Sequence, residues 1–207
     1  MIARHKIRLC QAIFATTIAI LIASTFTGRV VCSTLSNVYS SVVGAIAALK
    51  GPLHGGAGVG VLEALSELGS VDKVADFVRG KFERKEKIMG FGHRVYKVED
   101  PRAIHLRELG RKLSELSDEL QWFQISEAME NAVRGEKPIS VNVDFYSATV
   151  QRYLGVPKDL FTCTFAASRI SGWTAHILEQ LSDNRLMCPR CDYTGPEPLD
   201  YVALADY

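Results

Sequence analysis

Cysteine and excess charge are both scarce in this chain of 207 residues. The five cysteines are an odd number without the regular spacing of a disulfide framework, which favours reduced thiols in a cytoplasmic setting. The 24 basic and 23 acidic residues leave a net charge of +1, so the composition excludes a general attraction to nucleic acid or to an acidic membrane surface. Binding partners must therefore be inferred from individual sites.

Two familiar site motifs are absent or incomplete. The phosphate-binding sequence Gly-x-x-x-x-Gly-Lys-Ser/Thr does not occur. Cys188-Pro-Arg-Cys191 has the spacing of a zinc or redox pair, but a structural zinc site needs four ligands and the other cysteines are single and distant. A redox pair of the thioredoxin type needs a helix after it, whereas Asp192-Tyr-Thr-Gly-Pro196 follows. We therefore expect two incidental thiols and no metal site.

The amino terminus has the outline of a secretory signal peptide. Four basic residues precede an apolar run from Leu9 to Ala23: Arg4, His5, Lys6 and Arg8. The run is short for a membrane span, which needs about 17 to 25 apolar residues. The alternative is a helix buried in a core or an interface.

Helical periodicity dominates the rest of the chain, which is long enough to bury a core in one large or two small domains. The expected helices cover residues 26–49, 106–120, 123–133, 145–154 and 160–181. Only Ile139 to Val143 resembles a strand. Clusters of glycine and proline at 51–60, 88–101 and 134–142 mark the joints. The sequence thus predicts an all-α fold.

The stretch from Gly90 to Ala103 carries the most informative pair of side chains. His93 lies in a glycine-flanked loop, and Asp100 and Pro101 predict the N-cap and the first residue of a helix that holds Arg102 at its start. An imidazole beside a guanidinium suits a substrate with a polar carbonyl and a carboxylate.

Three further residues are candidates, each with a structural alternative. His54 lies in Gly51-Pro-Leu-His-Gly-Gly-Ala57. Either the glycines let a ligand approach this histidine closely, or they only end the preceding helix and His54 is a solvated loop residue. Asp144 lies at the start of an apolar helix, where burial raises its pKa and the helix amino terminus lowers it. It is either a catalytic base or a helix cap. Arg169 lies on an apolar helix and needs an anion, either a bound ligand or an internal carboxylate.

Four motifs in this order resemble the citrate synthase family: Gly-Pro-Leu-His-Gly-Gly-Ala, Gly-Phe-Gly-His-Arg-Val-Tyr-Lys followed by Asp-Pro-Arg, Asn-Val-Asp-Phe-Tyr-Ser, and Ser-Arg-Ile-Ser-Gly-Trp. The similarity is to the bacterial and archaeal branch, which includes 2-methylcitrate synthases. It runs from about Ala23 onward and covers the back half of a family member.

This resemblance implies an all-α fold with a large domain and a small domain that closes over the substrates. Residues 23–60 and 166–207 would belong to the large domain, 61–165 to the small domain, and 1–22 would be an atypical apolar segment. The implied protein is a cytoplasmic homodimer that condenses acetyl-CoA with oxaloacetate to citrate and CoA, without a cofactor. Propionyl-CoA would replace acetyl-CoA in a 2-methylcitrate synthase. Membrane and nucleic acid are not expected partners.

The resemblance also implies roles for the candidate residues. Asp144 would remove a proton from the thioester methyl group, His54 would stabilise the enol oxygen, and His93 would donate to the ketone of oxaloacetate. Arg102 and Arg169 would hold its carboxylates. The backbone of Gly90, Phe91 and Gly92 would approach the adenine of coenzyme A.

Two departures from the family pattern concern the substrate site. Ala19-Ile-Leu-Ile22 stands where the family usually reads His-Glu-x-Asn, and Cys188 stands where it commonly has the first arginine of Arg-Pro-Arg. Residues 1–22 thus look like a foreign or altered start joined to a family back half, which makes export an unlikely expectation. The alternative function is an inactive fragment or an assembly subunit that needs the front half from another chain.

Overall fold

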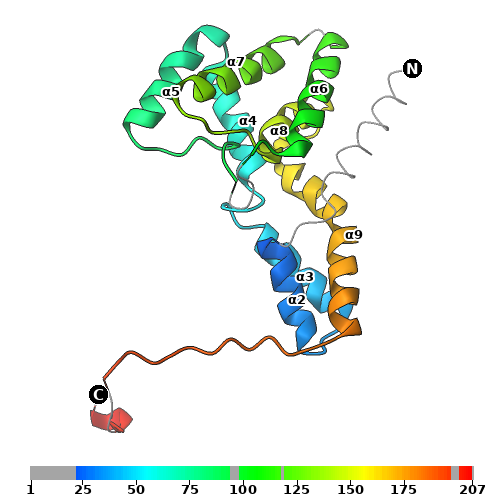
Figure 1. The fold of residues 1–207 in the computed structure, drawn as a ribbon, viewed down its shortest axis with the longest axis vertical. Coiled ribbons are helices and arrows are strands. Elements are labelled where there is room, and N and C mark those ends of the chain that lie inside the picture. The colour runs from blue at the N-terminus through cyan, green and yellow to red at the C-terminus, as the bar shows by residue number, and fades with distance from the viewer. Residues whose placement is uncertain (1–21, 94–97, 118, 197–200, 207) are drawn as a thin grey trace.

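The computed structural model describes residues 22–93, 98–117, 119–196 and 201–206 (Figure 1). The predicted all-α fold is confirmed, because no strand occurs among these residues. The helices are α2 (Ala23–Ser33), α3 (Val38–Leu49), α4 (Ala57–Leu68), α5 (Val74–Glu83), α6 (Pro101–Glu115), α7 (Gln121–Glu136), α8 (Val143–Tyr153) and α9 (Phe161–Ser182). Short 3-10 helices are η1 (Val71–Lys73), η2 (Lys158–Leu160) and η3 (Leu204–Asp206).

The helix predicted over 26–49 is wrong in one respect, because the chain breaks between α2 and α3. Leu35 has a φ of 65°, which no α-helix accommodates. Asn37 then caps α3, and its side chain accepts a hydrogen bond from Ser40 N at 2.8 Å. Residues 34–37 therefore form the turn of a helical hairpin.

Two other predictions need correction. Residues 57–60 were expected in a joint, yet they begin α4, where Gly58 packs against Phe161 and Phe165 of α9. The strand-like stretch 139–143 reduces to one isolated antiparallel bridge between Phe91 and Val141, and α8 already begins at Val143.

The described helices form two apolar clusters that share α9. The larger is built by α4 to α8 and includes Leu65, Leu106, Met129, Phe145 and Tyr146, all fully buried. The smaller lies between α2, α3 and the lower part of α9, and its buried members are Cys32, Ala45, Leu49, Phe165, Trp173 and Ile177. Figure 1 shows α9 running from beneath α8 down beside α2 and α3. The domain division at 60 and 165 stays a prediction.

The chain beyond α9 is extended and leads away from the helices (Figure 1). Cys188 and Cys191 are exposed free thiols in this segment. No group of three metal-ligating side chains occurs in the part of the chain that the structure describes. None of the described helices is long and apolar enough to cross a membrane. The two readings of the amino-terminal apolar run, and Ala19, concern residues 1–21 and lie outside the described residues.

Candidate active site

A tight turn places His54 between the two clusters. Gly55 N donates to Leu49 O at 2.9 Å, and Thr162 Oγ1 of α9 donates to Gly55 O at 2.9 Å. A Cβ on Gly55 would lie only 2.3 Å from Leu49 O, so this close return of the chain requires glycine. The turn fixes the backbone from which His54 projects.

His54 is partly buried and hydrogen-bonded to a side chain of α2, so the solvated-loop interpretation is wrong. Its Nε2 lies 3.0 Å from Ser24 Oγ of α2, and Trp173 Nε1 of α9 donates to the same oxygen at 3.2 Å. Burial, followed by the positive charge of Arg169, lowers the pKa of His54 below its usual value. The imidazole is therefore neutral at pH 7 and can act as a hydrogen-bond donor.

The predicted cap at the start of α6 is confirmed and has a second role. Asp100 is the N-cap, and its Oδ1 accepts from Arg102 N at 3.0 Å. The same carboxylate accepts from Arg102 Nε at 2.9 Å and Nη2 at 2.7 Å, a forked ion pair with only 1% of the Asp100 side chain exposed. Burial raises the pKa of Asp100, but its bonds to Arg102 outweigh burial and the net shift is downward. Asp100 thus fixes the Arg102 guanidinium in one orientation.

His93 is partly buried beside this pair. Burial is the main cause that lowers its pKa below the usual value; the charge of Asp100 opposes the shift and that of Arg102 adds to it. His93 is therefore also neutral at pH 7 and able to donate a hydrogen bond.

Hydrogen bonds connect the glycine loop before His93 to the start of α8. Gly90 and Gly92 have positive φ values of 85° and 76°, and a Cβ on Gly90 would lie 2.8 Å from the side chains of Phe145 and Val61. Asn142 N donates to Gly90 O at 2.9 Å, and Asn142 Nδ2 donates to Gly92 O at 2.8 Å. The loop and the helix start therefore form one rigid wall.

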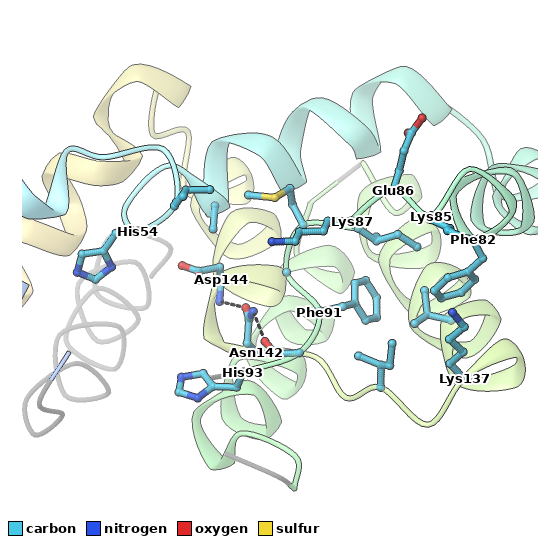
Figure 2. A pocket seen from close by; sticks show the side chains of 18 of the residues that line it. His54, Phe82, Lys85, Glu86, Lys87, Phe91, His93, Lys137, Asn142 and Asp144 are labelled. Atoms are coloured by element: carbon cyan, nitrogen blue, oxygen red, sulfur yellow. Dashed lines mark hydrogen bonds between the residues drawn. The ribbon is translucent and has the colours of Figure 1, made fainter. Parts of the chain in front are cut away.

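Asp144 is not the cap of α8, contrary to the structural alternative. Asn142 is the cap, and its Oδ1 accepts from Asp144 N at 3.0 Å (Figure 2). The Asp144 carboxyl is left to face a cavity. Burial raises its pKa to about 6, although the charges of Arg102 and Arg169 oppose the shift. Asp144 is thus mostly ionised at pH 7, yet more basic than an ordinary carboxylate.

Among the described residues, Arg169 forms no salt bridge with a carboxylate, which was the alternative to a bound ligand. The residue is 6% exposed, and its Nε and Nη1 atoms have no hydrogen-bond partner within the described residues. Burial and the nearby Arg102 lower its pKa to about 10, against the opposing charge of Asp144. A buried cation with two unsatisfied donors is costly unless an anion binds there. Arg169 therefore marks an anion site.

The five candidate side chains come together around a cavity of about 100 Å³. His54, His93, Arg102, Asp144 and Arg169 line it, and Ile22, Leu49, Val143 and Phe165 add apolar walls. A larger cleft of about 790 Å³ shares His54, His93 and Asp144 and is also lined by Gly90, Phe91 and Gly92. Figure 2 shows the histidines and Asp144 toward one end and Phe82 and Lys137 toward the other.

Several groups were missed in the sequence. Lys85, Lys87 and Lys137 line the large cleft and give it a cationic character suited to phosphate. Lysine recurs at positions 81, 85 and 87, and this recurrence could have indicated that Lys85 and Lys87 belong to a cationic site. Ser24 and Trp173 had no local indication, because their partner His54 lies far from both in the sequence.

The described residues at the two departures from the family pattern supply no polar group to the cavities. Ile22 presents an apolar side chain to both cavities. Cys188 is exposed, in the extended segment after α9. Neither residue supplies a polar contact to the described site.

Comparison with known proteins identifies the family. Residues 21–190 match the model for the citrate synthase C-terminal domain. The chain is 54% identical over 184 residues to citrate synthase 2 of Bacillus subtilis, covering 89% of this chain and 50% of that protein. It is 42% identical over 184 residues to a 2-methylcitrate synthase of Shewanella oneidensis, covering 89% and 49%. The chain thus spans about half the length of the curated relatives it matches.

A solved structure gives the same result. The ternary complex of citrate synthase from Thermoplasma acidophilum with carboxymethyl coenzyme A and oxaloacetate superposes with a TM-score of 0.89 and 37% identity. The match covers 98% of this chain and 56% of that chain. With the four ordered motifs and the helical fold, these matches show that the chain belongs to the citrate synthase family.

Proposed function

We propose that this chain carries the acyltransferase site of a citrate synthase, which condenses acetyl-CoA with oxaloacetate and releases citrate and CoA. The observation that supports this most strongly is the buried Arg169 guanidinium, whose two unpartnered donors lie in one cavity with Arg102 and Asp144. Two arginines suit the two carboxylates of oxaloacetate. The relative crystallised with oxaloacetate and a coenzyme A analogue supports the same substrates.

The proposed chemistry follows from the charge states of the site. Asp144, with a pKa of about 6, removes a proton from the thioester methyl group while neutral His54 donates to the enol oxygen. The carbon nucleophile attacks the ketone, and His93 donates a proton to the oxygen that becomes the hydroxyl. Water then hydrolyses the citryl thioester to citrate and CoA.

The larger cleft suits coenzyme A. Lys85, Lys87 and Lys137 would contact its phosphates, and the glycine loop would lie against the adenine. Coenzyme A is a substrate in this proposal, and no cofactor is required. We further propose a cytoplasmic homodimer, the location resting on the odd and unpatterned cysteine set.

The test is release of CoA by the purified protein, followed with a thiol reagent. Release should require both acetyl-CoA and oxaloacetate, and Arg169→Gln should abolish it. Arg111→Gln is the matched control, because Arg111 is an exposed arginine on α6 outside both cavities. A folded protein that releases no CoA above background would contradict the proposal.

A second candidate is 2-methylcitrate synthesis from propionyl-CoA, favoured by the 42% identity to the Shewanella oneidensis enzyme. The same assay decides between them, since a higher kcat/KM with propionyl-CoA than with acetyl-CoA would select it.

A third candidate is a subunit that needs another polypeptide for activity. The chain spans about half of its relatives, and Ile22 gives the substrate cavity an apolar wall. Activity that appears only on adding the front half of a relative would support this candidate. Full activity of the isolated chain would refute it.

A further inference from the structure

A group of charged side chains lies where α6, α7 and α8 meet, and none of its members lines either cavity. We call it the ion cluster; its members are Glu99, Arg107, Glu130, Arg134 and Tyr146. Glu130 of α7 is only 4% exposed, and Tyr146 of α8 is fully buried. The proposed chemistry uses none of these groups, so the burial of Glu130 needs another explanation.

Glu130 is the centre of the ion cluster and joins three helices. Arg107 of α6 donates to both of its carboxylate oxygens, from Nε at 2.9 Å and from Nη2 at 2.5 Å. Arg134 Nη2, one turn later on α7, lies 2.9 Å from Glu130 Oε1, and the Tyr146 hydroxyl of α8 donates to Oε2. Burial, followed by the bond to Glu130, raises the pKa of Tyr146, so its hydroxyl keeps the proton that it donates.

Glu99 connects the ion cluster to the residues at the start of α6. Arg107 Nη2 also donates to Glu99 Oε1, and Arg134 Nη2 lies 3.1 Å from the same oxygen. Glu99 directly precedes Asp100, whose carboxylate forms the forked ion pair with Arg102. A continuous series of ionic contacts and one peptide bond therefore leads from α7 to the Arg102 guanidinium.

Apolar packing alone would define the position of α6 less well. Ala103 and Leu106 of α6 are buried in the larger cluster, but apolar contacts are not directional. A forked bond between a guanidinium and a carboxylate requires one geometry. Buried ion pairs add little net stability, and the best-supported reason to keep one is that it selects a single arrangement of the elements around it.

We propose that Arg107 is a positioning residue that acts through Glu99 to hold the Arg102 guanidinium at the anion cavity. Arg107 touches no substrate, and its role is to keep the start of α6 in the register in which Arg102 and Arg169 line one cavity. This inference rests on the proposed function only in taking the bound anion to be oxaloacetate.

The first test needs no substrate. Nitrogen-15 NMR follows the Nε–H of Arg102, which donates to Asp100 and is assigned by its loss in Arg102→Lys. Arg107→Lys keeps the positive charge but cannot form the forked pair, so the Arg102 Nε–H should exchange with water about tenfold faster than in the parent. Arg79→Lys is the matched control, because Arg79 forms an exposed ion pair with Asp76 on α5. The control should keep the parent rate.

The second test measures binding by calorimetric titration. Arg107→Lys should bind oxaloacetate about tenfold more weakly, the effect of losing one hydrogen bond to a charged group. Its affinity for CoA should equal that of the parent, because no residue of α6 lines the larger cleft. An equal loss of both affinities would indicate a general disturbance of the fold and would contradict the proposal.

A double-mutant cycle shows whether the effect passes through Arg102. In an Arg102→Lys background, titrated to millimolar oxaloacetate, Arg107→Lys should change the affinity by less than about twofold. The same tenfold loss in both backgrounds would overturn the proposal, because independent sites have additive effects.

Glu99→Gln covers the case in which Arg107→Lys does not fold, since Glu99 is partly exposed and glutamine keeps its shape. It should also speed the exchange of the Arg102 Nε–H. An unchanged exchange rate in either folded variant would contradict the proposal. If the parent binds no oxaloacetate, the proposed function fails, whereas the exchange measurement still decides this inference.

Discussion

At the residue scale, the site depends on groups whose ordinary properties are altered by their surroundings. Arg169 is a buried cation with unsatisfied donors, and Asp144 is a carboxyl whose pKa is raised to about 6. Burial is also the main cause that lowers the pKa of His54 and of His93. Such a set costs stability in the free protein, and the proposed substrate, with two carboxylates and a ketone, would offset this cost.

The activity prediction at this scale concerns Asp144. Asp144→Ala should lower kcat by about 10² to 10⁴, the usual contribution of a general base. Circular dichroism should show an unchanged helical content. Asp159→Ala, at an exposed position of η2, is the control and should keep the rate. An unchanged rate in Asp144→Ala would show that another group is the base.

The same residue gives a prediction about stability and pH. The pKa of Asp144 rises from an ordinary 3.8 to about 6 on folding, so the folded state binds this proton more tightly than the unfolded state. The stabilisation is present below pH 3.8 and is lost as the pH rises through 6, leaving an ionised carboxylate that costs on the order of 1 to 3 kcal/mol.

Asp144→Asn removes this titration. Urea unfolding should therefore show the variant more stable than the parent at pH 8, with a difference that shrinks as the pH approaches 4. A difference that does not change with pH would mean that Asp144 has an ordinary pKa in the folded protein.

At the element scale, α9 and the turn after α3 join the two helical clusters. Thr162 holds Gly55, Arg169 lines the cavity and Trp173 reaches Ser24, so one face of α9 makes three separate contacts with the site. Sequence periodicity predicted α9 almost to its ends. It could not predict these contacts, because the Trp173 and Ser24 pair is separated by 149 residues and depends on how the helices pack.

The break between α2 and α3 was missed for a local reason. Apolar residues recur at helical spacing on both sides of it, and no glycine or proline marks the turn. The positive φ is adopted by Leu35, a residue that seldom has one. By contrast, the cap Asp100-Pro101 was predicted because both residue types have specific preferences at a helix start.

A pair of glycine substitutions tests the turn. Gly55→Ala should destabilise the protein by about 1 to 3 kcal/mol, because the new Cβ would meet Leu49 O and the Thr162 side chain. Gly135→Ala should be neutral or stabilise by about 0.5 to 1 kcal/mol, because that α7 position is open and alanine is the better helix former. Urea unfolding measures both, and equal effects would contradict the described turn.

At the scale of the whole molecule, the smaller cluster is poorly covered. Helix α3 has no charged residue along its length, and it leaves Tyr39 84% exposed and Val43 65% exposed. A surface of this kind usually meets another polypeptide. In the proposed homodimer, a second copy would cover it.

Sedimentation velocity tests this assignment. The parent protein should have twice the monomer mass, and Val43→Lys should shift it toward the monomer, because burying a lysine there opposes association. Leu116→Lys is the control, since Leu116 is 66% exposed directly after α6, a helix of the larger cluster. A parent that is monomeric at all concentrations would refute the homodimer.

The four ordered motifs singled out the five candidate residues that line the smaller cavity, because each motif combines a reactive side chain with the glycine, proline or asparagine that shapes its backbone. Lys85, Lys87 and Lys137, which line the larger cleft, were not predicted. The recurrence of lysine through residues 81–87 is the local indication for the first two, and Lys137 has none. The sequence could also not show that Nε and Nη1 of Arg169 have no hydrogen-bond partner among the described residues, because that depends on every element around them.

Formation of the new carbon–carbon bond is the most direct measure of the central claim. The protein is incubated with oxaloacetate and acetyl-CoA labelled with carbon-13 in the methyl group, and the products are followed by carbon NMR. We predict that the label moves from the thioester methyl group into a methylene group of citrate, and that it remains in the methyl group with Asp144→Ala. A folded parent protein that leaves all of the label in acetyl-CoA would contradict the account.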